Sequence, residues 1–265
     1  MKRIVIAAAA LSLASAPLLA QGTTSALEKD FRTRTSLDID WKLAKGLHLD
    51  LGYELRTEDN FGAIDRHQAQ IGLNYKVNKW LKTGVSYTYI YHNRGEKGWT
   101  PRHRLSADVT FGYRTGDWRF SLKEQLRLTH KTESLNSCQE VRNPLILKSR
   151  VKAQYKGWKH LEPYGFLEVR NIFNDPSCSA TWSTTSKAYA DYSFGGYNSL
   201  YINRLRGAMG LEWKISKHSA IDLYGMLDYC YDKNIDVDRT QTYLRELTWD
   251  QSLNGIVGVG YKFSF

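Results

Sequence analysis

Serine and histidine side chains in the first half of the chain could form a hydrolytic centre. A serine nucleophile needs a histidine within hydrogen-bond reach, and a third group must orient that histidine. Ser86 and His92 share one face of an alternating segment, with Asn93 beside them, whereas His103 lies on the opposite face of the next segment. Because the two histidines point in different directions, a lipid-modifying hydrolase of the outer membrane is only a second alternative.

Acidic side chains near the end of the chain could supply the paired carboxylates of a protease. The candidates are Asp228, Asp232, Asp236 and Asp238. Acids in an exposed polar stretch are normally solvated, and no histidine or cysteine cluster has the spacing of a metal site. We therefore expect no enzyme activity, no catalytic residue, no metal and no cofactor.

Charged residues at every second position of apolar segments are more informative. If each segment is a strand that closes a barrel, these residues face its lumen. The main basic candidates are Lys148, Arg150, Lys152, Arg204 and Arg206, and the main acids are Asp38, Asp40, Glu168 and Asp222. The same face also carries Arg34, Arg56, Arg104, Arg119, Arg127, Arg170 and Asp228.

Two functions are compatible with these charges. Charged groups in a narrow interior must pair with one another, so mixed signs predict a filled or narrow-lumen scaffold or surface protein. The surplus of bases supports the alternative of a small monomeric porin for anionic solutes or acidic oligosaccharides, because rings of basic side chains select anions.

One group of basic residues can distinguish these two functions. It occupies three consecutive inward positions of one segment, Lys148, Arg150 and Lys152. Glu168 on a flanking segment could neutralise them, and Glu124 could do so only if a β-bulge turns it inward. Replacing all three by glutamine should reduce anion selectivity if they line a pore. The same change should weaken folding if they are buried in salt bridges.

The elements that position these residues are strands, because apolar and polar residues alternate with period two. From Phe31 to Leu43 and again from Leu47 to Leu55, every second residue is apolar or Thr and the intervening ones are polar, charged or Gly. Nine more such segments span 66–77, 80–92, 103–114, 117–130, 145–156, 160–173, 201–215, 219–231 and 253–265. Their lengths exceed the roughly 9–11 residues with which a tilted strand crosses a bilayer.

The connections alternate between tight turns and long polar loops, as in barrels with short periplasmic turns and long extracellular loops. We expect loops at 58–65, 93–102, 131–144, 174–200 and 232–252. A periplasmic aromatic girdle near the tight turns comprises Trp41, Trp80, Trp118, Trp158 and Trp213. An opposite girdle comprises Tyr87, Tyr89, Tyr91, Tyr201, Tyr229 and Tyr231. Amphipathic rings prefer membrane interfaces.

The first residues predict export. Lys2 and Arg3 precede an apolar stretch that is too short to span a bilayer, and a small residue, Ala20, precedes Gln21. We expect a signal peptide over 1–20, after which the net charge of +10 falls to +8. An exported basic chain meets lipopolysaccharide or acidic solutes rather than nucleic acid. Of the cysteines Cys138, Cys178 and Cys230, one is left over in an oxidising compartment, and the first two are the pair most able to meet.

Several segments resemble an uncharacterised family of outer-membrane barrels from Bacteroidetes-type bacteria, domain of unknown function 2490. The resemblance rests on residues 80–91, 101–105, 120–127, 147–150 and 258–265, and it departs at Gln125 and over 174–200. The last of these segments alternates aromatics up to a terminal Phe265, which resembles the assembly signal read by the barrel-assembly machinery. The resemblance implies a fold and a location and assigns no activity.

Together these features predict a signal peptide, 1–20, followed by one domain, 21–265. The fold class is all-β, a transmembrane up-and-down antiparallel β-barrel in the cell outer membrane. Eleven strands are readable, but bacterial single-chain barrels have even numbers, so we expect twelve within a range of ten to twelve. The expected partners are outer-membrane lipid, lipopolysaccharide, the barrel-assembly machinery and small anionic solutes.

Overall fold

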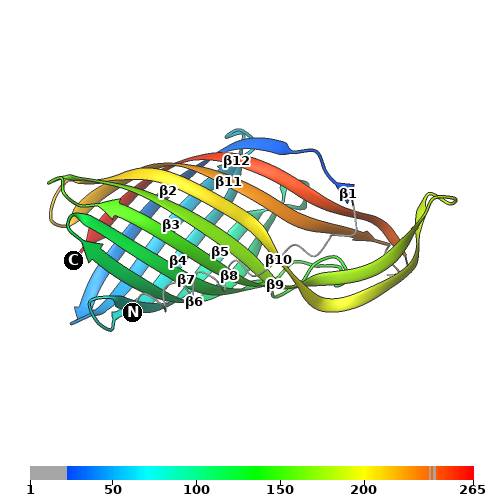
Figure 1. The fold of residues 1–265 in the computed structure, drawn as a ribbon, viewed down its shortest axis with the longest axis horizontal. Helices are drawn as coiled ribbons and strands as arrows, with labels where there is room; N and C mark the ends of the chain where they lie inside the picture. The colour runs from blue at the N-terminus through cyan, green and yellow to red at the C-terminus, as the bar shows by residue number, and fades with distance from the viewer. Residues whose placement is uncertain (1–22, 239, 241–242) are drawn as a thin grey trace.

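The computed structural model describes residues 23–238, 240 and 243–265, so the expected signal peptide lies outside the described residues. Figure 1 shows strands that wrap into a barrel, with hairpins projecting beyond one end. The elements are β1 Thr23–Thr24, β2 Glu28–Ala44, β3 Leu47–Glu58, β4 Ala63–Lys76, β5 Leu81–Asn93, η1 Gly95–Lys97, β6 Trp99–Thr115, β7 Trp118–Lys131, β8 Leu145–Tyr155, β9 Leu161–Ser183, β10 Ala188–Lys214, β11 Ser219–Val237 and β12 Leu244–Ser264.

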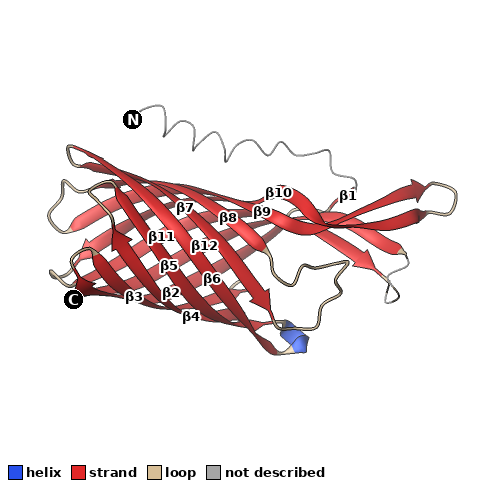
Figure 2. Ribbon diagram, turned by 90° about the horizontal axis from the view of Figure 1, so that it is seen from below, coloured by secondary structure: helices blue, strands red, loops and turns tan. Residues whose placement is uncertain are grey.

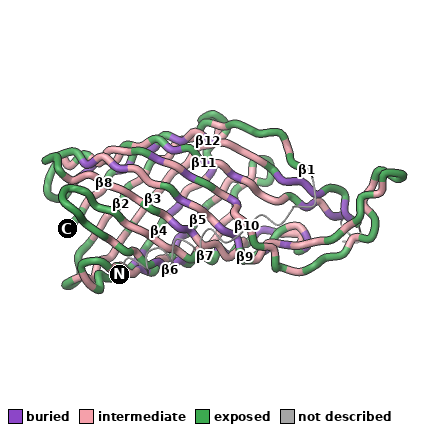
Figure 3. Tube along the Cα trace, in the orientation of Figure 1, coloured by how far each residue is buried: buried purple, intermediate pink, exposed green. Residues whose placement is uncertain are grey.

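All eleven predicted strands are present, and their alternation separates an apolar exterior from a polar lumen. On β9, Leu167 is 70% exposed whereas the next residue, Glu168, is 2% exposed. On β11, Leu227 is 63% exposed and Asp228 is 2% exposed. Buried and exposed segments consequently alternate along the strands in Figure 3. The residues buried inside the barrel therefore include many charged side chains, and the apolar side chains face outward.

The barrel wall has eleven strands, and the prediction of twelve is wrong. Consecutive strands from β2 to β12 pair antiparallel, and a parallel pairing of β12 with β2 closes the barrel. The two residues of β1 pair with β12 on the same edge as β2, at Thr248 and Trp249. They extend that edge and add no strand to the wall. An odd number places the start of β2 and the end of β12 at opposite ends of the barrel, which is why the closing pair is parallel.

The predicted loops at 174–200 and 232–252 are largely strand. β9 and β10 continue to a hairpin tip at residues 184–187, and β11 and β12 also run past the barrel (Figures 1 and 2). These extensions have a small apolar core of their own. Its buried members are Cys138, Ile235, Val237, Leu244 and Leu247, with Cys178, Ala180, Tyr189 and Tyr192 packed against them. This core stabilises strands that carry no long apolar alternation.

Glu124 does not turn inward, which corrects the expected bulge. β7 pairs with β6 and β8 without a register shift, and Glu124 faces Ser149 across the β7–β8 pair. The Ser149 hydroxyl donates to the Glu124 carboxylate at 2.5 Å on the outer face of the barrel. A hydrogen bond on that face therefore accommodates the acid without a break in the strand. Among the described residues no helix has the length and apolar character needed to cross a membrane.

Candidate functional site

The lumen contains a polar cavity of about 860 Å³ toward the end of the barrel that carries the long hairpins. We call this end the loop end and the opposite end the turn end. Thirteen basic and seven acidic side chains of the described residues line the cavity. Its wall therefore carries an excess of positive charge, and four of the five predicted basic candidates, Lys148, Arg150, Arg204 and Arg206, belong to it.

The row of residues at the bottom of the cavity alternates in charge because the strand register sets these residues side by side. Arg150 of β8 pairs with Glu168 of β9, which pairs with Arg206 of β10, and Arg206 pairs with Asp228 of β11. Opposite charges at directly opposed positions of neighbouring strands attract. The register thus builds a belt of ion pairs across four strands.

Glu168 is the centre of this belt. Its carboxylate accepts from Arg150 Nε at 2.8 Å and from Arg206 Nη1 at 3.1 Å, and it lies 3.0 Å from Lys148 Nζ. Arg206 also donates from Nη2 to Asp228 at 3.0 Å. Except for Arg150, these groups are almost inaccessible although they face the lumen, so other side chains fill the barrel beside them.

The next row toward the turn end is apolar. Phe166, Ala208, Met226 and Ile256 are direct neighbours on β9, β10, β11 and β12, and the last three are buried. The Arg150 guanidinium lies 4.3 Å from the Phe166 ring centre and covers it. An apolar layer therefore lies directly beneath the charged belt.

Two tyrosine rings form the third row. Tyr164 lies against Gly210, and Tyr224 lies against Gly258, where a Cβ would come within 2.0 Å of the ring. Glycine at these positions makes room for rings that lie flat on the inner wall. The Tyr164 hydroxyl donates to Asp222 at 2.8 Å. We call the three rows together the floor of the cavity.

The other predicted lumen residues lie at the turn end. Lys152 places its ammonium 3.8 Å from the centre of the Tyr164 ring, Asp222 pairs with Lys262 at 2.9 Å, and Asp38 accepts from the Ser36 hydroxyl at 3.3 Å. Asp40 accepts from or pairs with His48 at 2.5 Å. Along β8, Lys148 and Arg150 therefore share the negative charge of Glu168, whereas Lys152 makes a cation–π contact with Tyr164.

Asp175, Tyr201 and Lys233 form a cluster at the mouth of the cavity that the sequence analysis missed. Tyr201 donates its hydroxyl to Asp175 at 3.1 Å, and Lys233 Nζ lies 3.8 Å from the same carboxylate. Burial raises the pKa of Asp175 to about 6, and the charge of Lys233 opposes this rise. The negative charge at the mouth therefore decreases as the pH falls through about 6.

Tyr201 was predicted to belong to the outer girdle and instead lines the cavity. The pairing of β10 with β9 shifts between Ile202 and Arg204. Relative to the residues after the shift, a one-residue shift moves the side chains before it to the opposite face of the strand. The bulge thus turns Tyr201 inward.

The hydrolase candidates do not come together. Ser86 and His92 lie on the same strand, six residues or about 20 Å apart. His92 Nδ1 lies 3.2 Å from Asp65, while His103 Nδ1 bonds Tyr87 on the outer face at 2.7 Å. Among the protease candidates, Asp228 belongs to the floor, and Asp232 and Asp236 accept from Asn203 and Gln139. The geometry therefore assembles neither site.

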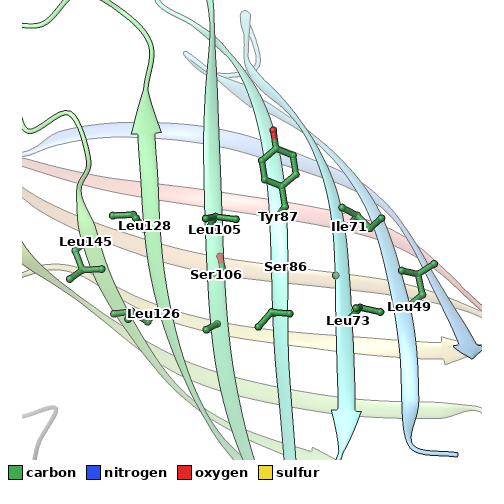
Figure 4. Close-up of a pocket in the computed structure, with 13 residues that line it drawn as sticks. Leu49, Ile71, Leu73, Ser86, Tyr87, Leu105, Ser106, Leu126, Leu128 and Leu145 are labelled. Carbon is green, nitrogen blue, oxygen red and sulfur yellow. The ribbon is translucent and has the colours of Figure 1, made fainter. Parts of the chain in front are cut away.

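The outer wall is apolar and has a shallow hollow of about 670 Å³ across β3 to β8. Figure 4 shows the side chains that line it, which come from neighbouring strands, among them Leu49, Ile71, Leu105, Leu126 and Leu145. At the turn end the five predicted tryptophans, Trp41, Trp80, Trp118, Trp158 and Trp213, are each about half exposed. Phe265 donates its backbone N–H to the backbone carbonyl of Asp40, and its ring lies 6.0 Å from that of Trp41.

Cys138 of the β7–β8 loop and Cys178 of β9 belong to the same apolar cluster, and Cys230 lies in the lumen wall beside Asn254. The three cysteines carry thiols in this structure. Disulfide formation requires Cα atoms within about 7 Å, which favours cysteines of one cluster. We therefore expect Cys138 and Cys178 to pair upon export while Cys230 stays reduced. Peptide mapping without reduction, by mass spectrometry, checks this. A disulfide that includes Cys230, or three thiols in the exported protein, would contradict it.

The fold and the lumen define a closed all-β barrel with a basic cavity and a filled floor. Residues 31–239 match the family described as protein of unknown function (DUF2490). The chain belongs to this family, as the sequence resemblance predicted.

Among solved structures, the outer-membrane expressed OmpT of Vibrio cholerae is 12% identical with a TM-score of 0.36. The match covers 82% of this chain and 61% of that one, so the chain spans less than two thirds of that protein. No curated protein matches the sequence.

Proposed function

We propose that the protein is an integral outer-membrane barrel with a basic cavity that opens toward the cell exterior and is closed by the floor on the periplasmic side. Small anionic solutes are held in this cavity. The observation that carries this proposal is the cavity itself, in which thirteen basic side chains outnumber seven acidic ones above a filled floor. The loop end faces outward in this proposal, and the turn end faces the periplasm. No reaction is assigned to the protein.

The exterior of the barrel supports the membrane location. Its exposed surface carries large apolar side chains on every strand of the wall, including Leu105 at 60% and Met209 at 78%. Soluble monomers rarely expose contiguous apolar patches larger than a few hundred Å². Lipid chains would cover this face and fill its hollow, while half-exposed tryptophans at the turn end would lie at the interface. The natural partners on the outside are lipid and lipopolysaccharide.

Burial of the floor supports a receptor-like or scaffold role over an open pore. Glu168, Arg206 and Asp228 of the floor face the lumen and are each at most 8% exposed. An open channel would keep such side chains in contact with water. We therefore assign the anion preference of the basic side chains to binding and not to conduction.

Heat modifiability and fractionation test the membrane assignment. We expect the mature chain to sediment with outer membranes and to migrate as a compact species in sodium dodecyl sulfate until it is boiled. The reason is that a closed barrel pairs its backbone groups internally and leaves no strand edge. Recovery in the soluble periplasmic fraction, with a single band regardless of boiling, would refute the proposal.

A further inference from the structure

Five neighbouring strands each place one basic side chain around the cavity, above or level with the top of the floor. These residues are Arg104 of β6, Arg127 of β7, Lys148 of β8, Arg170 of β9 and Arg204 of β10. We call this set the basic arc. All five members line the cavity.

The strand register forces like charges together in the basic arc. Arg170 pairs directly with Lys148 on one side and with Arg204 on the other. Like charges at directly opposed positions destabilise a sheet. The adjacent row toward the turn end alternates in sign from β8 to β11, where Glu168 lies between Arg150 and Arg206 and Arg206 pairs with Asp228. The barrel thus has one row of alternating charges and, beside it, a row in which the cations of Lys148, Arg170 and Arg204 are direct neighbours.

Three members of the arc have only neutral acceptors. Nε of Arg104 donates to Thr129 at 3.1 Å, Nε of Arg127 to Gln125 at 2.8 Å, and Nε of Arg170 to Asn203 at 2.7 Å. Within the described residues no ion pair involves these three arginines. Each of them therefore lacks a direct ion pair with an acid of the described residues.

The remaining two members are incompletely satisfied. Lys148 shares Glu168 with Arg150 and Arg206, and Arg204 reaches Asp228 only at 3.4 Å. The buried Nε of Arg204 also has no acceptor in the described part of the chain. A donor without an acceptor is costly inside a protein. An oxyanion seated beside the Arg204 guanidinium would supply that acceptor.

We propose that the basic arc binds a small solute that carries at least two oxyanion groups, as phosphate, sulfate or carboxylate. The inference rests on the proposed function and names its site and ligand class. Guanidinium groups bind such oxyanions through paired hydrogen bonds, and a single negative charge could not relieve five cations. The cavity volume of about 860 Å³ suits a small organic molecule.

Isothermal titration of the folded full-length mature protein in detergent tests the site. The probes are inorganic tripolyphosphate and citrate, with acetate as the single-charge comparison, at pH 7.5 and constant ionic strength. We expect a polyanion to bind and acetate not to bind measurably. Arg170→Gln should weaken polyanion binding roughly tenfold or more, because a charged hydrogen-bonding partner is lost. The ranking of the two polyanions distinguishes phosphate from carboxylate ligands.

A matched control is Arg119→Gln on β7, because Arg119 is exposed near the turn end and lies outside the cavity. This control should bind polyanions like the wild type. Urea unfolding separates binding from a merely structural role. Without ligand, Arg170→Gln should be as stable as the wild type or more stable, because a repelled charge is removed. Polyanion should raise the wild-type unfolding midpoint more than that of the variant at the same concentration.

Equal polyanion affinity of the wild type and Arg170→Gln would overturn the inference, as would the failure of both polyanions to bind. These outcomes differ from failure of the proposed function. A chain recovered outside the outer membrane refutes the location whatever the titration gives. An outer-membrane barrel with a closed floor that binds no polyanion refutes only the site.

Discussion

Replacing Glu168 with glutamine should destabilise the folded barrel by about 3–5 kcal/mol, as expected when one partner of a buried ion pair is removed. The Glu168 side chain is 1% exposed and forms ion pairs with Lys148, Arg150 and Arg206. Glutamine keeps the shape and removes the charge, so the cations lose their common partner. Urea unfolding of the protein in lipid vesicles, followed by tryptophan fluorescence, measures the free energy of unfolding.

Glu140→Gln is the control for this prediction. Glu140 pairs with Lys131 at 2.7 Å, but its side chain is 48% exposed, so its loss should change stability by at most about 1 kcal/mol. Adding Lys148→Met to Glu168→Gln should restore part of the lost stability, because one stranded charge disappears. Equal stabilities of Glu168→Gln and the wild type would show that the belt contributes nothing to folding.

Removing the aromatic part of the floor should convert the closed barrel into a conducting one. The double variant Phe166→Ala and Tyr224→Ala deletes one ring from the apolar row and one from the tyrosine row. We expect stepwise conductance in planar bilayers, with chloride favoured over potassium because bases line the cavity above. The folded fraction is first verified by heat modifiability.

Phe120→Ala combined with Tyr113→Ala removes the same two side-chain types from the outer wall, where Phe120 is 40% and Tyr113 is 68% exposed. This control should not conduct. Conductance in the control would point to a general loosening of the barrel. If the folded double variant Phe166→Ala and Tyr224→Ala shows no conductance, the lumen is closed at a place other than these rings.

The strands could be predicted from the sequence because burial on one face of a barrel requires period-two alternation, which is a local property. The closure could not be predicted, because it depends on how β2 and β12 meet. Their parallel pairing, from Ser252 with Glu28 to Ser264 with Asp40, yields eleven strands where a general rule favours twelve. The hairpin extensions were missed for a related reason, since their small core combines residues from distant segments.

The charged lumen was predicted in composition but not in arrangement. Lys148, Arg150 and Lys152 follow one another along β8. Across the β8–β9 pair, however, they face a base, an acid and an aromatic ring, respectively: Arg170, Glu168 and Phe166. Arg170 was one inward base among many until the register placed it between Lys148 and Arg204. Tyr201 required a bulge that leaves no signature in the sequence.

Single-channel recording of the wild-type protein in a planar bilayer tests most directly whether the lumen is a closed, basic cavity. The protein should insert, as verified by its heat-modifiable band after recovery, and show no steady open state under moderate applied voltage. The aromatic rings of Phe166, Tyr164 and Tyr224, beneath the buried belt, block the path. A stable, ohmic, anion-selective conductance of the unmodified protein would contradict this account and identify the barrel as a pore.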